Sequence, residues 1–243
     1  MRNLMIFGLL VMMLVAAQFA TGQTVDEVIN KYVDTLGGKD KLNAIKSIYK
    51  EGTMEMMSNE ITVRVTKEQG KLSRTEFDVG GSTGFRLVTA KEAWSYIPMR
   101  SPTPVKLSDA AAASMQTELD IAGPLVDYVA KGHKAELIGK DTLHGNECYK
   151  IKLITAAGKE ILFWINTKTY LLDQSSQQNS GMGDGKTPIE VISVYKDYSP
   201  VDGIMIAHII ETTTQGGKGM NGGTTFDKIQ LNIPVDAKLY KPE

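Results

Sequence analysis

The residues that could bind a metal or act as a nucleophile are few and widely spaced. The three histidines are His133, His144 and His208, and no two of them have the close spacing typical of protein metal sites. The single cysteine, Cys148, excludes a disulfide within the chain, and its strand-like surroundings favour a buried, unreactive thiol. These residues predict neither a metal site nor a cofactor.

Two further patterns bear on catalysis. The glycine-rich stretch 181–187 is similar to a phosphate-binding loop, but Ser180 stands where such a loop needs its first glycine, and a strand pattern follows. We therefore predict a hairpin loop there. The serines, histidines and acidic residues form no triad that can be assembled from sequence alone. Carboxylates that meet only in space leave no linear motif, so the expectation that this is not an enzyme rests on missing positive signals.

The first 22 residues have the pattern of a secretory signal peptide. Arg2 precedes an apolar run over 4–17, and Ala20, Thr21 and Gly22 place small residues before Gln23. A membrane anchor is the alternative, but the run of about 14 residues is shorter than the roughly 20 that span a bilayer. We predict cleavage near Gln23. Because no cysteine follows that site, the mature chain should be unlipidated, soluble and located outside the cytoplasm.

The charge of the chain is nearly balanced. The formal net charge is −1 at pH 7, and no block of basic residues is present. Nucleic acid is therefore not expected as a partner. Residues 23–243 are predicted to form a single domain, since β-rich domains of this length are common.

The apolar spacing predicts a mainly β protein of the α+β class. Helical periodicity covers 25–36 behind Thr24, with Gly37 and Gly38 as the stop, and a second short helical stretch includes Leu42 and Ile45. Alternation with period two then predicts an antiparallel meander over 48–97. Two short helices separated by Gly123 and Pro124 are expected within 98–131. Further strands are predicted at 134–140, 147–155, 159–165, 169–177, 189–197, 204–214 and 224–232, about eleven in all.

Some of these strands are apolar on both faces, and two interpretations remain open. The run 161–165 is continuously apolar and 204–210 is nearly so, so both faces of these strands must be covered. Either the interior is filled, or it holds a cavity for an apolar ligand. Methionines such as Met99 and Met115 suit irregular ligands but are also ordinary core residues.

The chain resembles the LolA/LolB-like superfamily of periplasmic lipoprotein carriers, the outer membrane lipoprotein-sorting proteins. The resemblance covers nearly all of 23–243. Asn166 stands where the family usually has aspartate, and Ala207 replaces a proline. The residues that carry the resemblance are 25–32, 36–38, 147–151, 158–160, 164–172, Tyr198, Asp202, Gly203, Ile229 and Asn232.

The resemblance implies a strongly curved antiparallel sheet, an unclosed half-barrel of about eleven strands. An N-terminal helix and a central helical lid over 107–131 would cover it, and the enclosed cavity would hold acyl chains. Arg64, Arg74, Arg86 and Arg100 could each latch the lid, or could be solvated strand charges. The candidate cavity residues, chosen from apolar positions, are Trp94, Tyr96, Met99, Met115, Leu119, Leu125, Phe163 and Met205.

Three classes of function follow. The first is a soluble periplasmic carrier that takes acyl chains of lipoproteins or related lipids toward the outer membrane. It would act as a monomer, contact membranes transiently, and exchange cargo with donor and acceptor proteins of the inner and outer membranes. The second is a ligand-free structural or interaction module of the cell envelope on the same scaffold, which a filled core would favour. The third is an enzyme, which would need polar residues that converge in the cavity.

Overall fold

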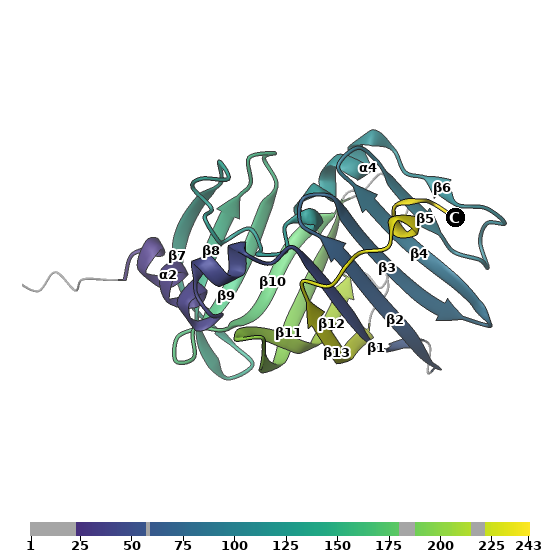
Figure 1. Cartoon of the computed structure of the whole chain (residues 1–243). Helices are drawn as coiled ribbons and strands as arrows, with labels where there is room; N and C mark the ends of the chain where they lie inside the picture. The colour runs from purple at the N-terminus through teal and green to yellow at the C-terminus, as the bar shows by residue number, and fades with distance from the viewer. Residues whose placement is uncertain (1–22, 57–58, 180–187, 215–221) are drawn as a thin grey trace, which may run out of the picture.

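A computed structural model describes residues 23–56, 59–179, 188–214 and 222–243 (Figure 1). The predicted signal peptide, at 1–22, and the predicted hairpin loop at 181–187 lie outside these residues.

The described residues form one antiparallel sheet of thirteen strands that does not close into a barrel. Its order is β6-β5-β4-β3-β2-β1-β13-β12-β11-β10-β9-β8-β7, so β1 and β13 join two hairpin meanders, and β6 and β7 are the edges. The bounds are β1 Ser47–Met56, β2 Asn59–Glu68, β3 Leu72–Val79, β4 Ser82–Thr89, β5 Ala93–Tyr96, β6 Val105–Lys106, β7 Lys134–Leu143, β8 Asn146–Ile154, β9 Glu160–Asn166, β10 Leu172–Asn179, β11 Ile189–Val201, β12 Ile204–Thr214 and β13 Gly222–Leu231.

The predicted half-barrel is confirmed, and the predicted number of strands is too low by two. One missed strand is β6, which is two residues long. Strand β1 lies within the meander predicted over 48–97, although Lys50 and Gly52, on the same side as Ile48, weaken its apolar alternation.

The first N-terminal helix covers the residues that the sequence predicts, and the second ends before Ile45, which the prediction includes. Helix α2 (Val25–Thr35) has a capping box in which Thr24 accepts from the Glu27 amide and Glu27 accepts from the Thr24 amide. Helix α3 is Lys39–Asn43. Gly37 has φ +123°, and a Cβ there would lie 2.5 Å from the Gly203 carbonyl oxygen. Glycine is therefore required where the chain leaves α2 and touches the start of β12.

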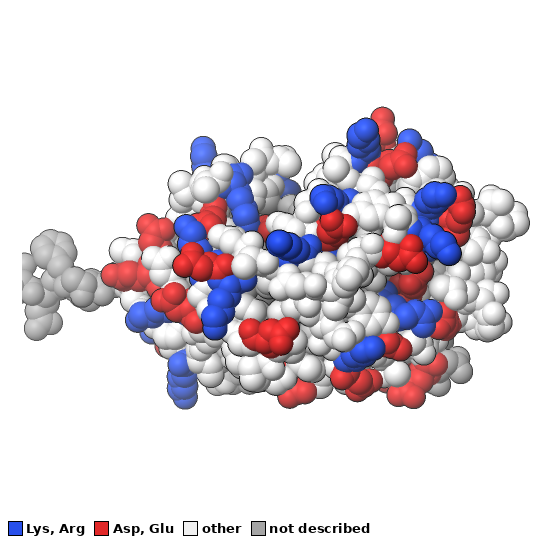
Figure 2. Space-filling view, viewed as in Figure 1, with Lys and Arg blue, Asp and Glu red and all other residues white. Residues whose placement is uncertain are grey.

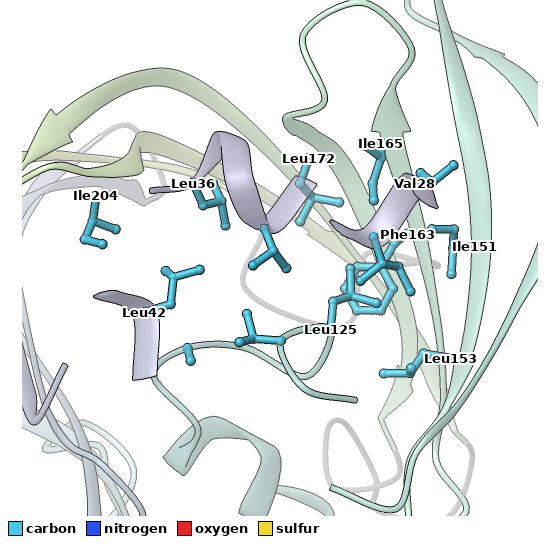
Figure 3. Packing of buried hydrophobic residues seen from close by; sticks show 14 of the residues in the cluster. Val28, Leu36, Leu42, Leu125, Ile151, Leu153, Phe163, Ile165, Leu172 and Ile204 are labelled. Carbon is cyan, nitrogen blue, oxygen red and sulfur yellow. The ribbon is translucent and has the colours of Figure 1, made fainter. Parts of the chain in front are cut away.

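The main core lies between α2, α3 and the β8–β10 side of the sheet. Figure 3 shows Leu125 and residues of α2 gathered against Phe163 and Ile151. Tyr149, Leu153, Ile161, Ile165 and Leu172 belong to the same cluster. The continuously apolar run of β9 is thus explained on its concave side by this core. On its other face, the Trp164 indole N–H donates to Asp141 at 3.0 Å.

The central helical segment is shorter than predicted. Helix α4 (Asp109–Ser114) begins behind Ser108, whose hydroxyl accepts from the Ala111 amide, and the 3₁₀ helix η2 covers Gln116–Leu119. The prediction of a second helix is wrong: residues 121–132 form turns and bends instead. Gly123 has φ +88° and Asp127 has φ +52°, values that interrupt a right-handed helix.

The convex face of β3–β5 is covered by the C-terminal segment. The 3₁₀ helix η4 (Ala237–Tyr240) packs on Leu72, Phe85 and Leu87. Arg74, 5% exposed, donates to the carbonyl oxygens of three C-terminal residues and to the Glu76 carboxylate at 3.0 Å. Those carbonyls belong to Leu239, Lys241 and Glu243. Arg74 therefore holds the chain end onto the sheet.

Replacing Arg74 should release the C-terminal segment. Arg74→Gln is expected to lower the free energy of unfolding by about 2 to 4 kcal/mol, because Glu76 and three C-terminal carbonyls lose their charged, buried partner. The matched control Arg64→Gln breaks the more exposed pair with Asp78 and should cost less than about 1 kcal/mol. Urea denaturation measures both variants, and equal losses would contradict this role for Arg74.

Candidate functional site

Cross-strand register identifies the concave face of the β1–β6 half. One row of directly paired residues crosses the sheet strand by strand from β13 to β5. It consists of Leu231, Ile48, Lys67, Ser73, Val88 and Ala93. Val88 and Ala93 pack under α4 and η2 with Ala112, Met115 and Leu119. Opposed residues share a face, so this row lies on the concave side beneath the helical segment.

The next row on the same face carries positive charge. It consists of Ile229, Lys50, Val65, Thr75, Arg86 and Ser95, all half-buried. Lys67 lies diagonal to Lys50 across β1 and β2, a separation of about 7–8 Å between Cα atoms in antiparallel pairs. The concave face therefore places Lys50 and Lys67 close together, and Arg86 lies farther along the same face, three strands from Lys50 and within electrostatic reach of Lys67.

Two of these cations are bound by the segment 107–119, which we call the lid. Arg86 Nη2 lies 2.9 Å from the Glu118 carboxylate, and Lys67 Nζ donates to the Glu118 carbonyl oxygen at 3.1 Å. Of the four arginines proposed as latches from sequence, Arg86 is the one whose guanidinium contacts the lid. Arg64 pairs with Asp78, Arg74 holds the C-terminus, and Arg100 is exposed.

Lys50 is the cation without such a partner. Its ammonium lies 5.1 Å from the centre of the Phe226 ring, and among the described residues no carboxylate is within ion-pair distance of it. Desolvation by the surrounding protein, and then repulsion by Lys67, lower the pKa of Lys50 to about 8. Burial also lowers the pKa of Lys67, which Glu118 partly opposes. Keeping these two ammonium groups charged therefore lowers the stability of the folded protein.

Other interior groups share this environment. Tyr32 on α2 and Tyr195 on β11 are only half-buried, yet desolvation raises the pKa of both hydroxyls. The Tyr195 hydroxyl lies 3.0 Å from the Ser175 hydroxyl on the concave side of β10.

A cleft of about 770 Å³ opens beside the lid. Its walls are α4 and η2 on one side and the β8–β9 hairpin on the other, and Figure 2 shows a notch in the molecular surface between these two regions. Lys159 reaches across from the hairpin to the Ser114 carbonyl oxygen at 3.4 Å. The main lining residues are Ala110, Ala113, Thr117, Pro124, His133 and Ala156. The volume is within the roughly 300–1,000 Å³ usual for small-molecule sites.

A second cleft, of about 680 Å³, lies between α2 and residues 125–130. It is bordered by Asp26, Asp34 and Asp127, and Tyr128 donates to Asp26 at 2.6 Å. That hydrogen bond raises the pKa of Tyr128 to about 12. This cleft is polar at its rim and offers less to an acyl chain than the first.

The eight predicted cavity residues are dispersed. Leu125 and Phe163 are buried in the main core, against which Met205 packs, and Leu125 also borders the second cleft. Met115 and Leu119 lie under the lid. Trp94 and Tyr96 pack with the C-terminal segment on the convex face, and Met99 is 76% exposed. Their role in ligand binding stays a prediction, and sequence reasoning missed Lys50 and Lys67.

One catalytic pattern was overlooked in the sequence. Gly80-Gly81-Ser82-Thr83-Gly84 has the G-x-S-x-G spacing of hydrolase nucleophiles. In the structure it is the turn and first residues of the β3–β4 hairpin, where Ser82 is exposed and opposes Val79. A nucleophile elbow requires a strand followed by a helix, so this match has a structural explanation.

The histidines and the cysteine are also placed. Cys148 is buried, as predicted, and desolvation raises the pKa of its thiol to about 12. His208 contacts Ser199 at 2.8 Å and the Phe226 carbonyl at 3.0 Å. In the part of the chain that the structure describes, no three histidine, cysteine or acidic side chains are grouped as metal ligands.

Comparison with solved structures decides the fold. A LolA superfamily protein from Nitrosomonas europaea matches with a TM-score of 0.56 and 12% identity, over 90% of this chain and 99% of that one. A putative outer membrane lipoprotein-sorting protein domain from Vibrio parahaemolyticus matches with a TM-score of 0.54 and 10% identity, over 88% and 94%. The chain has a LolA-like fold.

A DUF1329 family protein from Desulfovibrio piger also shares this LolA-like fold, with a TM-score of 0.57 and 12% identity over 90% of this chain and 98% of that one. No protein-family model and no curated protein sequence matches the chain. Within the described ranges, no helix is both long enough and apolar enough to cross a membrane.

Because the buried charge of Lys50 lowers stability, replacing Lys50 with an apolar residue should stabilise the folded protein. Lys50→Met should raise the free energy of unfolding at pH 7 by about 1 to 3 kcal/mol, since one pKa unit corresponds to about 1.4 kcal/mol. Between about pH 8 and 10 the unfolded wild type binds more protons than the folded one, so its stability should rise with pH relative to Lys50→Met.

Urea denaturation at pH 7, 8 and 9.5 measures this difference. Lys228→Met, on the exposed convex face of β13, is the matched control and should change stability little. A loss of stability in Lys50→Met at pH 7 would show that the ammonium has a partner and is not held at a cost.

Proposed function

We propose that this protein is a soluble periplasmic carrier that binds acyl chains of lipoproteins or related lipids and moves them toward the outer membrane. The observation that carries the proposal is the LolA-like half-barrel with a cleft of about 770 Å³ beside its lid. The carrier works without catalysis or a cofactor, as a monomer. It contacts membranes transiently and exchanges cargo with donor and acceptor proteins.

The need for a carrier follows from the cost of exposing acyl chains. Each methylene group exposed to water costs about 0.8 kcal/mol, so a chain leaves a membrane only when it enters another apolar site. The similarity to a lipoprotein-sorting domain supports such cargo. The balanced surface charge in Figure 2, where acidic and basic side chains are interspersed, offers no patch for a polyanion on that face.

Unequal packing of the covering elements supports a movable lid. The lid packs through a cluster of five buried residues among those described, whereas the core beneath α2 contains nineteen. Ala122, Leu125 and Val126 belong to that larger core. The sequence predicted a lid over 107–131, but these contacts limit the movable part to 107–119. Displacement of the lid would expose Lys67 and Arg86.

The test is the mass of the protein as it is made in a cell. The full chain is expressed in a bacterium with two membranes, purified from the periplasm without detergent, and weighed under native conditions before and after organic extraction. We expect an extractable acyl-chain ligand at near one per protein, and a chain that begins near Gln23. An unchanged mass, with no binding of added acylated peptide or phospholipid, would contradict the carrier.

A plug in the cleft tests the route of entry. Ala113→Trp places a large ring in the cleft and should lower ligand occupancy several-fold, whereas Ala90→Trp, exposed and outside both clefts, should not. Ligand recovered per protein after extraction measures the effect. Equal recovery from the two variants would show that the ligand does not enter beside the lid.

A ligand-free interaction module of the cell envelope is the second candidate. The observation that favours it is the filled core beneath α2, where large side chains such as Phe163 and Leu125 occupy the space. The native mass experiment separates the two candidates, since this module would carry no extractable ligand.

A further inference from the structure

The charges on the concave face do not balance. Lys67 and Arg86 face one carboxylate of the lid, that of Glu118, which is already paired with Arg86 at 2.9 Å, and no lid carboxylate lies against Lys50 among the described residues. Asp120, the next acidic residue, is paired with Lys131 at 2.6 Å. An unpaired interior cation destabilises the folded state, and such groups are concentrated at functional sites.

We propose that Lys50, with Lys67 beside it and Arg86 farther along the same face, binds the anionic head group of an acyl-chain amphiphile. The head group is a carboxylate or a phosphate, and the chain lies on the neighbouring apolar part of the concave face. This inference rests on the carrier function and names the chemistry of its ligand.

Apolar residues adjoin the cationic row on the same face. The next row along the strands consists of Phe226, Gly52, Val63, Phe77 and Gly84. Phe226 and Val63 are buried, and the Phe77 ring lies where a Cβ of Gly84 would be, at 2.3 Å. The charged row and the apolar row therefore lie next to each other on the concave face, as the head group and the chain of an amphiphile do.

The geometry of β1 fixes the Lys50 side chain at this boundary. The register between β1 and β13 shifts between Glu51 and Gly52, and a Cβ on Gly52 would lie 1.8 Å from the Thr225 carbonyl oxygen. This bulge brings Phe226 of β13 against Gly52, and the Lys50 ammonium lies over the Phe226 ring at 5.1 Å. The ring orients the ammonium without neutralising it.

The site should bind its anion in a pH-dependent way. The groups that face it are Lys67 on β2, Arg86 on β4, Glu118 and Asp120 of the η2 region, and His208, which contacts the Phe226 carbonyl. With a pKa of about 8, Lys50 is protonated in about half of the free protein at pH 8. A bound anion favours the protonated form, so binding takes up a proton above that pH.

The experiment compares four amphiphiles with the same twelve-carbon chain. Dodecanoate, dodecyl phosphate, dodecyl maltoside and dodecyltrimethylammonium are titrated into delipidated full-length mature protein below their micelle concentrations, by calorimetry at pH 7. We expect the two anions to bind at least tenfold more tightly than the other two. The difference between dodecanoate and dodecyl phosphate identifies which head group fits.

Variants assign the effect to Lys50. Lys50→Gln should lose at least tenfold in affinity for the anions with dodecyl maltoside unchanged, and Lys50→Arg should keep most of the preference. Lys228→Gln, on the opposite face, is the control. From pH 7 to pH 9 the affinity of wild type for dodecanoate should fall about tenfold, with uptake of a proton at the higher pH.

The outcomes separate this inference from the carrier function. Equal affinity for all four amphiphiles, or an anion preference that survives in Lys50→Gln, would overturn the head-group site and leave the carrier standing. Binding of none of the four would contradict both.

Discussion

The pairing of β1 with β13 is the interaction on which the rest of the structure depends. It joins the meander β1–β6 to the meander β7–β13, so without it the sheet would be two separate units. The bulge in β13, where Asp227 is the extra residue opposite Glu51 and Gly52, increases local twist and curvature, as bulges do in antiparallel pairs. The two halves then face a common interior, α2 and α3 cover one of them, and the lid covers the other (Figure 1).

The two covered parts of the concave face differ in how they are held. Beneath α2 the interior is a close-packed apolar core, which fixes that half. Beneath the lid the apolar contact is small, and charged groups contribute much of the attachment through Glu118. Ion pairs near a surface contribute little stability, which supports our proposal that this half is the one that opens. The uncompensated charge of Lys50 lies on β1, which stands between these two parts in the sheet.

Much of the fold could be predicted from the sequence, because its signals are local. Thr24 and Gly37 bound α2, period-two alternation gives most of the strands, and the family motifs indicate the half-barrel. The sequence prediction fails at positions whose surroundings are set by segments far away along the chain. Lys50 is separated by about 180 residues from Phe226 and Ile229, the residues of β13 beside it. Alone, a lysine in a weakly alternating strand indicates a solvated position.

The predicted cavity residues show the same limit. Trp94 and Tyr96 alternate with Ala93 and Ser95, and sequence does not say which pair faces the interior. The register with β4 places Ala93 and Ser95 on the concave side, and the C-terminal segment, about 140 residues later, covers the two aromatic residues. The usable signal was the small size of Ala93 and Ser95, which leaves room for the lid.

The location of a bound acyl chain tests the account most directly. A crystal of the delipidated protein with 12-bromododecanoate gives the bromine position from anomalous scattering and the carboxylate from density. The expected result is a carboxylate oxygen about 2.8 Å from Lys50 Nζ, with the chain over Val63 and Phe226. A carboxylate bound to Lys159, with the bromine in the outer cleft beside Ala113, would contradict a ligand site on the concave face.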